Sequence, residues 1–340
     1  MSSGYLFPLP LYLVLANIYI LLRLVAMCFL FSHEFREIAA VRKSAGLTGS
    51  IPSTRPYVPE KTHYLVPDLP ELSLPLAVIP PNVTACGPIV SSPTTTNNTE
   101  SSVQLLEWMR NGETVIVNFG SHICFEEGYC TSLARGLGIA LRKYSKLRVL
   151  WKLKQQAGIS LDGDITGALG PAWVEGRVKI VKWLDVSPAD LLALPGVVAS
   201  VHHGGANAYF ETCRLVSFIP FRLLRIHNCL PSIVSTSLFT YPGPRAGVPH
   251  VILPVWYDTY GNAACAEFLK IGIYANRNCA PGISDTEFGN ALCLVLDEND
   301  VCGKEIRSTS KTLGERCQKE SGREIAAGVI LKIIRGEIVL

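Results

Sequence analysis

A histidine, two glycines, an amide and a carboxylate are crowded into the stretch SVHHGGANAYFE (200–211). Glycines let a ligand approach the backbone closely, and the free N–H groups of a helix that begins here would favour an anion. His203 can donate a hydrogen bond to a phosphate oxygen. Asn207 and Glu211 are four residues apart and share a helical face, so the carboxylate suits ribose hydroxyls one turn from a phosphate. The stretch predicts a nucleoside diphosphate site, although on its own it fits a glycine turn with a capping Asn and a core His equally well.

Apolar strands that alternate with helices surround this stretch. Such continuously apolar strands indicate a parallel sheet covered on both faces, so we expect a doubly wound α/β domain over residues 80–335. Ligands of these sheets bind where strands end and turn into helices, and 200–211 is such a turn. The expected strands are 114–120, 148–153, 178–183, 196–203 and 249–256, and the expected helices are 126–145, 187–194, 205–213, 259–269 and most of 284–335.

The composition excludes several classes of protein. The chain has 340 residues, of which 48% are hydrophobic and 17% charged, so a large core is expected. The net charge is +3 without a block of Lys or Arg, which argues against a nucleic-acid partner. Eleven cysteines at irregular spacings, with no CxxC pair, indicate buried reduced thiols in a reducing compartment and neither a disulfide framework nor a zinc site.

Residues 9–31 form an apolar run with one charge, Arg23. The run is long enough to span a bilayer, and its apolar residues contribute roughly −4 to −8 kcal/mol to insertion against roughly +3 for a central Arg. The alternative, which we favour, is an apolar helix whose burial partners belong to a larger domain. We place the chain on the cytoplasmic side, with membrane association through 9–31 under the first interpretation.

Four motifs in the right order resemble the UDP-glycosyltransferase superfamily, and in detail its fungal branch. They are VNFGSH (117–122), VLWKLK (149–154), the stretch from VKWLDVSPADLL to ETCR (181–214) and AGVPHVILPVWYDTYGNAACAEFLKIGI (246–273). Stretches that resemble the interdomain segment of the family precede them. With these, the resemblance covers about four-fifths of the chain.

The resemblance implies a GT-B architecture in which the C-terminal half binds a UDP-sugar and the N-terminal half binds the acceptor and supplies the catalytic base. Residues 1–62 would be a remnant of the acceptor domain, 63–100 the linker, and 101–340 the Rossmann-like donor domain. An atypical segment, 215–245, interrupts the donor domain. We hypothesise that an unspliced intron encodes it, because removing it restores ETCRAGVPHVILP.

The resemblance also assigns donor-binding roles residue by residue. An indole would stack on uracil, and a carboxylate would hold the ribose. His203, Gly205 and the backbone amides near 206–207 would bind the diphosphate. Asp258 and Thr259 would hydrogen-bond to hydroxyls of the transferred sugar. Gly120 and Ser121 would line the cleft where the sugar meets the acceptor. In full, the predicted donor site comprises Gly120, Ser121, Trp183, His203, Gly205, Ala206, Asn207, Glu211, Asp258 and Thr259. A core aromatic remains the alternative for Trp183, and a helix N-cap for Asp258.

Three positions depart from the family pattern. Ala208 stands where many members have Ser, which removes one phosphate hydrogen bond worth about 1 kcal/mol. Val186 lies near the place of a Gln in plant relatives. Thr259 replaces a Gln that often reads the sugar, so a preference for glucose does not follow.

The family reaction is transfer of a hexose to a hydroxyl of a small lipophilic acceptor, with inversion at the anomeric carbon. It needs no metal and no cofactor besides the UDP-sugar co-substrate. Only about 60 residues precede the linker, and the catalytic His has no counterpart here; His33 lies in a different context. The expected alternatives are therefore a donor-binding subunit that works with a partner chain carrying the acceptor domain, or an inactive fragment.

Overall fold

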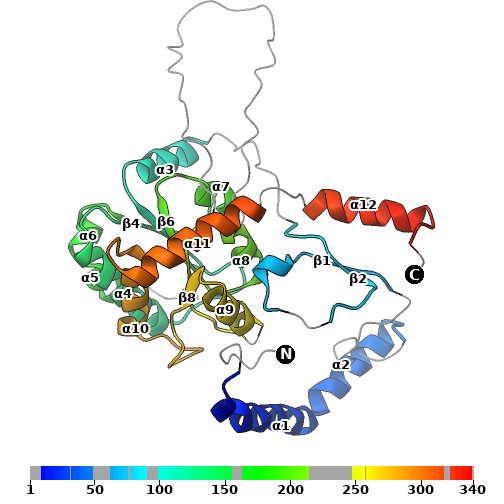
Figure 1. The fold of residues 1–340 in the computed structure, drawn as a ribbon. Coiled ribbons are helices and arrows are strands. Elements are labelled where there is room, and N and C mark those ends of the chain that lie inside the picture. Colours follow the sequence, from blue (N-terminus) through cyan, green and yellow to red (C-terminus); the bar gives the residue numbers. More distant parts are fainter. Residues whose placement is uncertain are drawn as a thin grey trace, which may run out of the picture.

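The computed structural model describes residues 9–30, 32–48, 62–75, 78–89, 99–154, 163–213, 247–256, 258–317 and 322–338. A parallel sheet of six strands lies at the centre, in the order β5-β4-β3-β6-β7-β8 (Figure 1). The strand order runs outward from β3 to β5 and then resumes at β6 on the other side, which is the expected doubly wound topology. The strands are β3 Thr114–Asn118, β4 Arg148–Lys152, β5 Val178–Val181, β6 Val197–His202, β7 His250–Ile252 and β8 Gly272–Tyr274.

Helices follow most of these strands, as the sequence predicts, and each expected helix begins and ends within about two residues of its predicted bounds. The short helices α5 and α6, the strand β8 and the helix α3 were not expected. The helices are α1 Val14–Leu30, α2 Ser32–Ser44, α3 Glu100–Arg110, α4 Glu127–Lys143, α5 Asp164–Leu169, α6 Pro171–Val174, α7 Pro188–Leu192, α8 Ala206–Cys213, α9 Thr259–Phe268, α10 Asp285–Leu296, α11 Val301–Cys317 and α12 Gly322–Ile334.

Both faces of the sheet are buried. Along β3, Val115 and Val117 belong to the core beneath α4, α5 and α10, whereas Ile116 belongs to the core on the opposite face, with residues of α3 and α7. Successive side chains of a strand point to opposite faces, so an unbroken apolar run is the pattern that two covered faces require. The prediction of a doubly wound α/β domain is confirmed.

A short parallel pair, β1 (Tyr64–Val66) with β2 (Val83–Ala85), precedes the six-stranded domain. The 3-10 helix Pro70–Leu72 between them packs on the domain: Leu72 is buried with α8 and α9, and its carbonyl accepts a hydrogen bond of 3.1 Å from the Tyr209 hydroxyl. The described part of the segment predicted as a linker thus contains two short strands and is anchored to α8 through Leu72.

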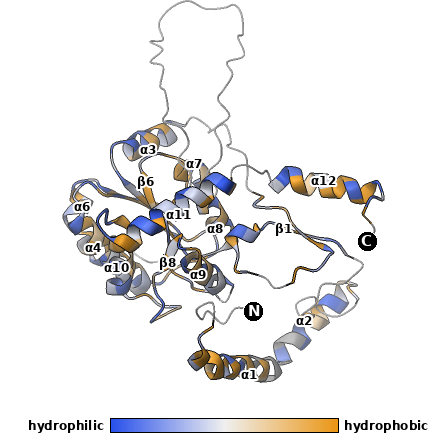
Figure 2. Cartoon of the chain, viewed as in Figure 1, coloured by the Kyte–Doolittle hydropathy of each residue, from blue (hydrophilic) through white to orange (hydrophobic). Residues whose placement is uncertain are grey.

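The helix α1 covers part of the apolar run 9–31 and exposes much of its apolar surface. Leu15 is 79% exposed and Leu22 64%, and the apolar character of α1 is visible in Figure 2. It continues into the more polar α2, and both helices lie to one side of the six-stranded domain (Figure 1). Within the described residues, no helix combines the length and the hydrophobicity needed to cross a bilayer.

Nine cysteines are free thiols: Cys86, Cys124, Cys130, Cys213, Cys265, Cys279, Cys293, Cys302 and Cys317. Six are buried, as expected, but Cys124 and Cys302 are exposed and Cys279 is intermediate, so the expectation of buried thiols is wrong at these positions. Exposed Cys124 lies after β3 and exposed Cys302 lies on α11, where the apolar pattern of the sequence is weaker. The atypical segment 215–245 lies outside the described residues.

Candidate functional site

A cavity of about 530 Å³ lies at the carboxyl ends of the central strands. It opens beside β3 and β6, the neighbours between which the strand order reverses, and this is where open α/β sheets bind ligands. All ten residues of the predicted donor site line it, although they come from segments up to 139 positions apart in the chain. They are Gly120, Ser121, Trp183, His203, Gly205, Ala206, Asn207, Glu211, Asp258 and Thr259.

The imidazole of His203 lies between two glycines. A Cβ added to Gly205 would stand 2.3 Å from its Nε2, and one added to Gly120 would stand 3.3 Å from its Cε1. Gly120 also has a φ of +76°, which side chains rarely adopt. Burial lowers the pKa of His203, while the carboxylate of Asp258 opposes that shift. Its Nδ1 is buried and has no hydrogen-bond partner among the described residues, an arrangement that native proteins avoid unless a ligand or water completes it.

The backbone before α8 is held from both sides at Gly204. Its N–H donates to Nδ1 of His202 at 3.0 Å, and its carbonyl accepts from the Asn262 amide at 2.7 Å. The first bond of the helix runs from the Tyr209 N–H to the Gly205 carbonyl. The N–H groups that precede Tyr209 in this turn therefore have no partner within the helix, and they lie at its positive end.

Glu211 and Lys152 bring opposite charges to the cavity. Burial raises the pKa of Glu211, and nearby Lys152 counteracts the shift. Burial, with a smaller contribution from Lys154, lowers the pKa of Lys152. The Lys152 ammonium lies 4.3 Å from the ring centroid of Trp183 and donates to the Gly120 carbonyl at 3.1 Å. Trp183 is 65% exposed, so its face is open to a planar ligand and the alternative of a core aromatic is wrong.

The neighbouring residues Asp258 and Thr259 differ in their exposure to solvent. Asp258 is exposed at the N-cap position of α9, but its side chain makes no capping hydrogen bond. Thr259 is buried, and its hydroxyl accepts from the Trp256 N–H at 3.2 Å and donates to the Trp256 carbonyl at 2.6 Å. The carboxylate is therefore available to a ligand, whereas the hydroxyl is already engaged by the backbone.

Sequence reasoning missed other residues of this cavity, among them Lys152, Trp256 and Asn118. Lys152 and Trp256 line it directly, and Asn118 accepts a hydrogen bond from the Gly120 N–H at 3.0 Å. A lysine within the apolar strand VLWKLK was a signal that could have been read, because a charge at the end of a buried strand needs a partner.

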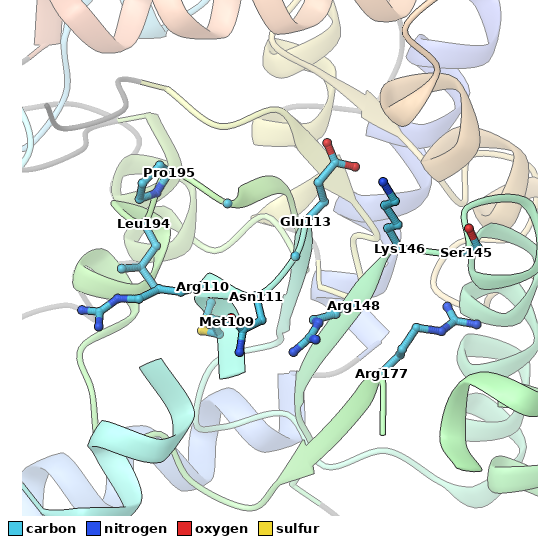
Figure 3. Close-up of a pocket in the computed structure, with 12 residues that line it drawn as sticks. Met109, Arg110, Asn111, Glu113, Ser145, Lys146, Arg148, Arg177, Leu194 and Pro195 are labelled. Carbon is cyan, nitrogen blue, oxygen red and sulfur yellow. The ribbon is translucent and has the colours of Figure 1, made fainter. Parts of the chain in front are cut away.

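A second hollow, of about 640 Å³, lies at the opposite, amino-terminal edge of the sheet (Figure 3). Two of its cations have structural partners: Arg148 donates to the Trp108 carbonyl at 2.6 Å, and Arg177 donates to the carbonyls of Leu141 and Leu147. These bonds satisfy carbonyls near the carboxyl ends of α3 and α4 and the Leu147 carbonyl just before β4. The predicted site residues all lie at the other edge. Among the described residues, no group of three or more His, Cys, Asp or Glu side chains is placed to hold a metal ion.

No model of a known protein family matches the chain. It is similar to glycosyltransferase sdnJ from Sordaria araneosa, with 32% identity over 365 aligned residues. That alignment covers 99% of this chain and 62% of sdnJ, so the chain spans about three-fifths of the length of this curated relative.

Solved structures of plant enzymes are similar to parts of the chain. Os79 from O. sativa, in complex with U2F and trichothecene, has a TM-score of 0.48 at 17% identity, over 67% of this chain and 44% of that one. Phytolacca americana UGT2, complexed with UDP-2fluoro-glucose and pterostilbene, has a TM-score of 0.48 at 19% identity, over 75% and 48%. A UDP-glucose: anthocyanidin 3-O-glucosyltransferase in complex with UDP has a TM-score of 0.47 at 19% identity, over 72% and 45%.

Proposed function

Because this chain belongs to the UDP-glycosyltransferase superfamily, we propose that its cavity binds a UDP-sugar whose hexose is transferred to a hydroxyl of a small lipophilic acceptor. The observation that carries the proposal is the convergence of ten residues, predicted from the sequence, on a single cavity at the reversal point of the sheet. A cavity of about 530 Å³ is within the range of small-molecule sites.

The diphosphate would lie against the start of α8. The amides there carry the positive end of the helix dipole, and the imidazole of His203 packs against Gly205 beside them, with Nε2 as its nearest nitrogen. Lys152, at the end of β4, adds a positive charge to the same cavity. Three kinds of donor on one side of the cavity suit an anion with several oxygens.

The uridine and the sugar would occupy opposite ends of the cavity. The exposed face of Trp183 suits stacking on uracil, and Glu211 suits two ribose hydroxyls, because a carboxylate accepts two hydrogen bonds at once. At the other end, the exposed carboxylate of Asp258 would hold hydroxyls of the hexose. Buried Thr259 would then support the turn and leave the sugar to its neighbour.

The transfer would proceed by inversion. The acceptor oxygen forms a bond to the anomeric carbon as the bond from that carbon to the β-phosphate oxygen breaks, and a general base takes the acceptor proton. UDP leaves with the bonding electron pair. His203 and the helix amides would stabilise the charge that develops on it. We propose none of the cavity residues named above as the general base that takes the acceptor proton.

A titration tests the donor site. We expect the purified chain to bind UDP and UDP-glucose in a calorimeter and to bind uridine much more weakly, since uridine lacks the phosphates that the start of α8 and Lys152 would hold. Asp258→Asn should weaken binding of UDP-glucose and leave binding of UDP itself unchanged. Absence of binding by any uridine nucleotide would contradict the proposal.

A second candidate function is a donor-binding subunit that needs a partner chain. The apolar side chains that α1 exposes, Leu15 and Leu22 among them, are the observation that favours it, because such a surface is rarely left bare. An assay of UDP release with a panel of lipophilic hydroxyl acceptors separates the two. Tight UDP binding with no transfer and no hydrolysis favours the subunit, and transfer by the chain alone favours the enzyme.

A further inference from the structure

Behind the phosphate turn, a row of buried side chains crosses the sheet. His202, the last residue of β6, lies next to His250, the first residue of β7, and both are 1% exposed. Nε2 of His202 lies 2.9 Å from Nδ1 of His250, and Nε2 of His250 lies 3.3 Å from Sγ of Cys213. The proposed function uses none of these three residues.

The hydrogen bonds of this row fix both imidazole tautomers. Nδ1 of His202 accepts the N–H of Gly204, so the proton of the neutral ring must be on Nε2. That N–H donates to Nδ1 of His250, so the proton of the second ring is also on Nε2 and points to the sulfur of Cys213. Burial lowers the pKa of both rings, that of His250 to about 3, and the neutral forms that the row requires are therefore the stable ones.

The row ties both ends of α8 to the sheet. Gly204 precedes the helix and Cys213 ends it. Substitution at Gly204 has no room, because a Cβ would stand 2.9 Å from both Ile252 Cγ2 and the Thr259 carbonyl oxygen. The Gly204 N–H thus points into the fold, toward Nδ1 of His202. The backbone must change direction at Gly204 before the N–H groups of the following residues can point into the cavity.

We propose that His202 and His250 are positioning residues for the diphosphate: they hold the Gly204 peptide inward and so orient the turn that opens α8 toward the ligand. This inference rests on the proposed function. It predicts that loss of the bond from the Gly204 N–H to His202 affects binding of the phosphates and leaves binding of the nucleoside unaffected, because that bond precedes α8, whereas Trp183 follows β5 and Glu211 lies toward the other end of α8.

The ratio of UDP affinity to uridine affinity measures this effect. His202→Leu removes the acceptor for the Gly204 N–H, and we expect about a tenfold weaker binding of UDP with unchanged binding of uridine. His202→Asn can place its amide oxygen near the position of Nδ1 and should restore the ratio to within about threefold. The matched control is Thr212→Val, which removes a buried hydrogen bond of 3.1 Å from α8 to Ser200 outside the row. It should lower stability and leave the ratio unchanged.

The outcomes distinguish the two proposals. If the wild-type chain bound neither UDP nor uridine, the proposed function would fail. If it bound UDP, and the ratio were the same in His202→Leu as in the wild type, the positioning role would be wrong. Should His202→Leu not fold, the ¹⁵N shifts of the wild-type imidazoles decide: both rings are expected as neutral Nε2–H tautomers at pH 7, and an Nδ1–H tautomer at His202 overturns the inference.

Discussion

Substitution of Gly205 by Ala tests the packing on which the site depends. The new Cβ would stand 2.3 Å from Nε2 of His203 and 2.8 Å from its Cε1, whereas ordinary contacts begin at 3.4 Å. The ring must therefore move by about 1.1 Å, the difference between 3.4 and 2.3 Å. Overpacking of this kind costs about 1–3 kcal/mol, so we expect the melting temperature to fall by a few degrees.

The same displacement should weaken UDP binding. The new Cβ pushes the ring away from Gly205, and a shift of about 1 Å takes the imidazole out of hydrogen-bond range of a phosphate. A hydrogen bond to a charged group contributes about 1.5–3 kcal/mol, which corresponds to about a 10- to 150-fold loss of affinity. Calorimetric titration with UDP measures it, and His203→Ala should show a loss of similar size.

Gly128→Ala is the matched control. Gly128 lies in the first turn of α4, where an added Cβ meets nothing within 4 Å, so the variant should gain about 0.4–1 kcal/mol and bind UDP as the wild type does. If Gly205→Ala bound UDP as tightly as the wild type while His203→Ala did not, the reasoning about ring displacement would be refuted.

Three further substitutions each change one residue that lines the cavity. Glu211→Gln removes a carboxylate whose pKa is raised by burial, and the charged form of such a group destabilises the fold above that pKa. The variant should therefore melt at a higher temperature than the wild type at pH 7, although it should bind UDP more weakly. The difference in melting temperature should shrink as the pH falls toward 4.5. Trp183→Ala should weaken uridine binding about tenfold with little change in melting temperature, because the side chain is 65% exposed; equal uridine affinity would contradict stacking. Lys152→Met should weaken UDP binding several-fold and uridine binding less, because Lys152 also contacts the Trp183 ring. Lys146→Met, at the opposite edge of the sheet, should change neither, and a uridine loss as large as the UDP loss would argue against a phosphate role.

The sequence predicts the fold more completely than it predicts the contacts within the site. The apolar strands and the amphipathic helices predict the sheet, because two covered faces leave an unbroken apolar pattern. The residues 203–211 could be assigned because their chemistry is local: the glycine, the amide and the carboxylate all belong to one turn and one helix. A local pattern also places Asp258 before α9, but the pattern does not tell whether its carboxylate caps the helix or faces the cavity.

The remaining features depend on distances across the sheet. Lys152 is a charged residue at the end of an apolar strand, and it reaches the Gly120 carbonyl only because β3 is the neighbour of β4. The hydrogen bond between His202 and His250 joins residues 48 positions apart, and no periodicity links them. Thr259 lies beside a residue with a predicted ligand role, but its hydroxyl is engaged by the backbone of Trp256. Such contacts follow from strand order and register, which the sequence pattern does not specify.

The strand order also sets the shape of ligand that the cavity can accept. Trp183 follows β5 and Asp258 follows β7, and four strand spacings, about 19 Å in all, separate those two strands. A planar base at one end and a sugar at the other can be held together only by a connection that is long and extended. The helix amides at the start of α8 and the Lys152 ammonium favour an anionic connection, whereas the Glu211 carboxylate favours hydroxyl groups beside it. A diphosphate satisfies both requirements, whereas a neutral glycoside of the same length would leave the Lys152 ammonium and the helix amides without acceptors.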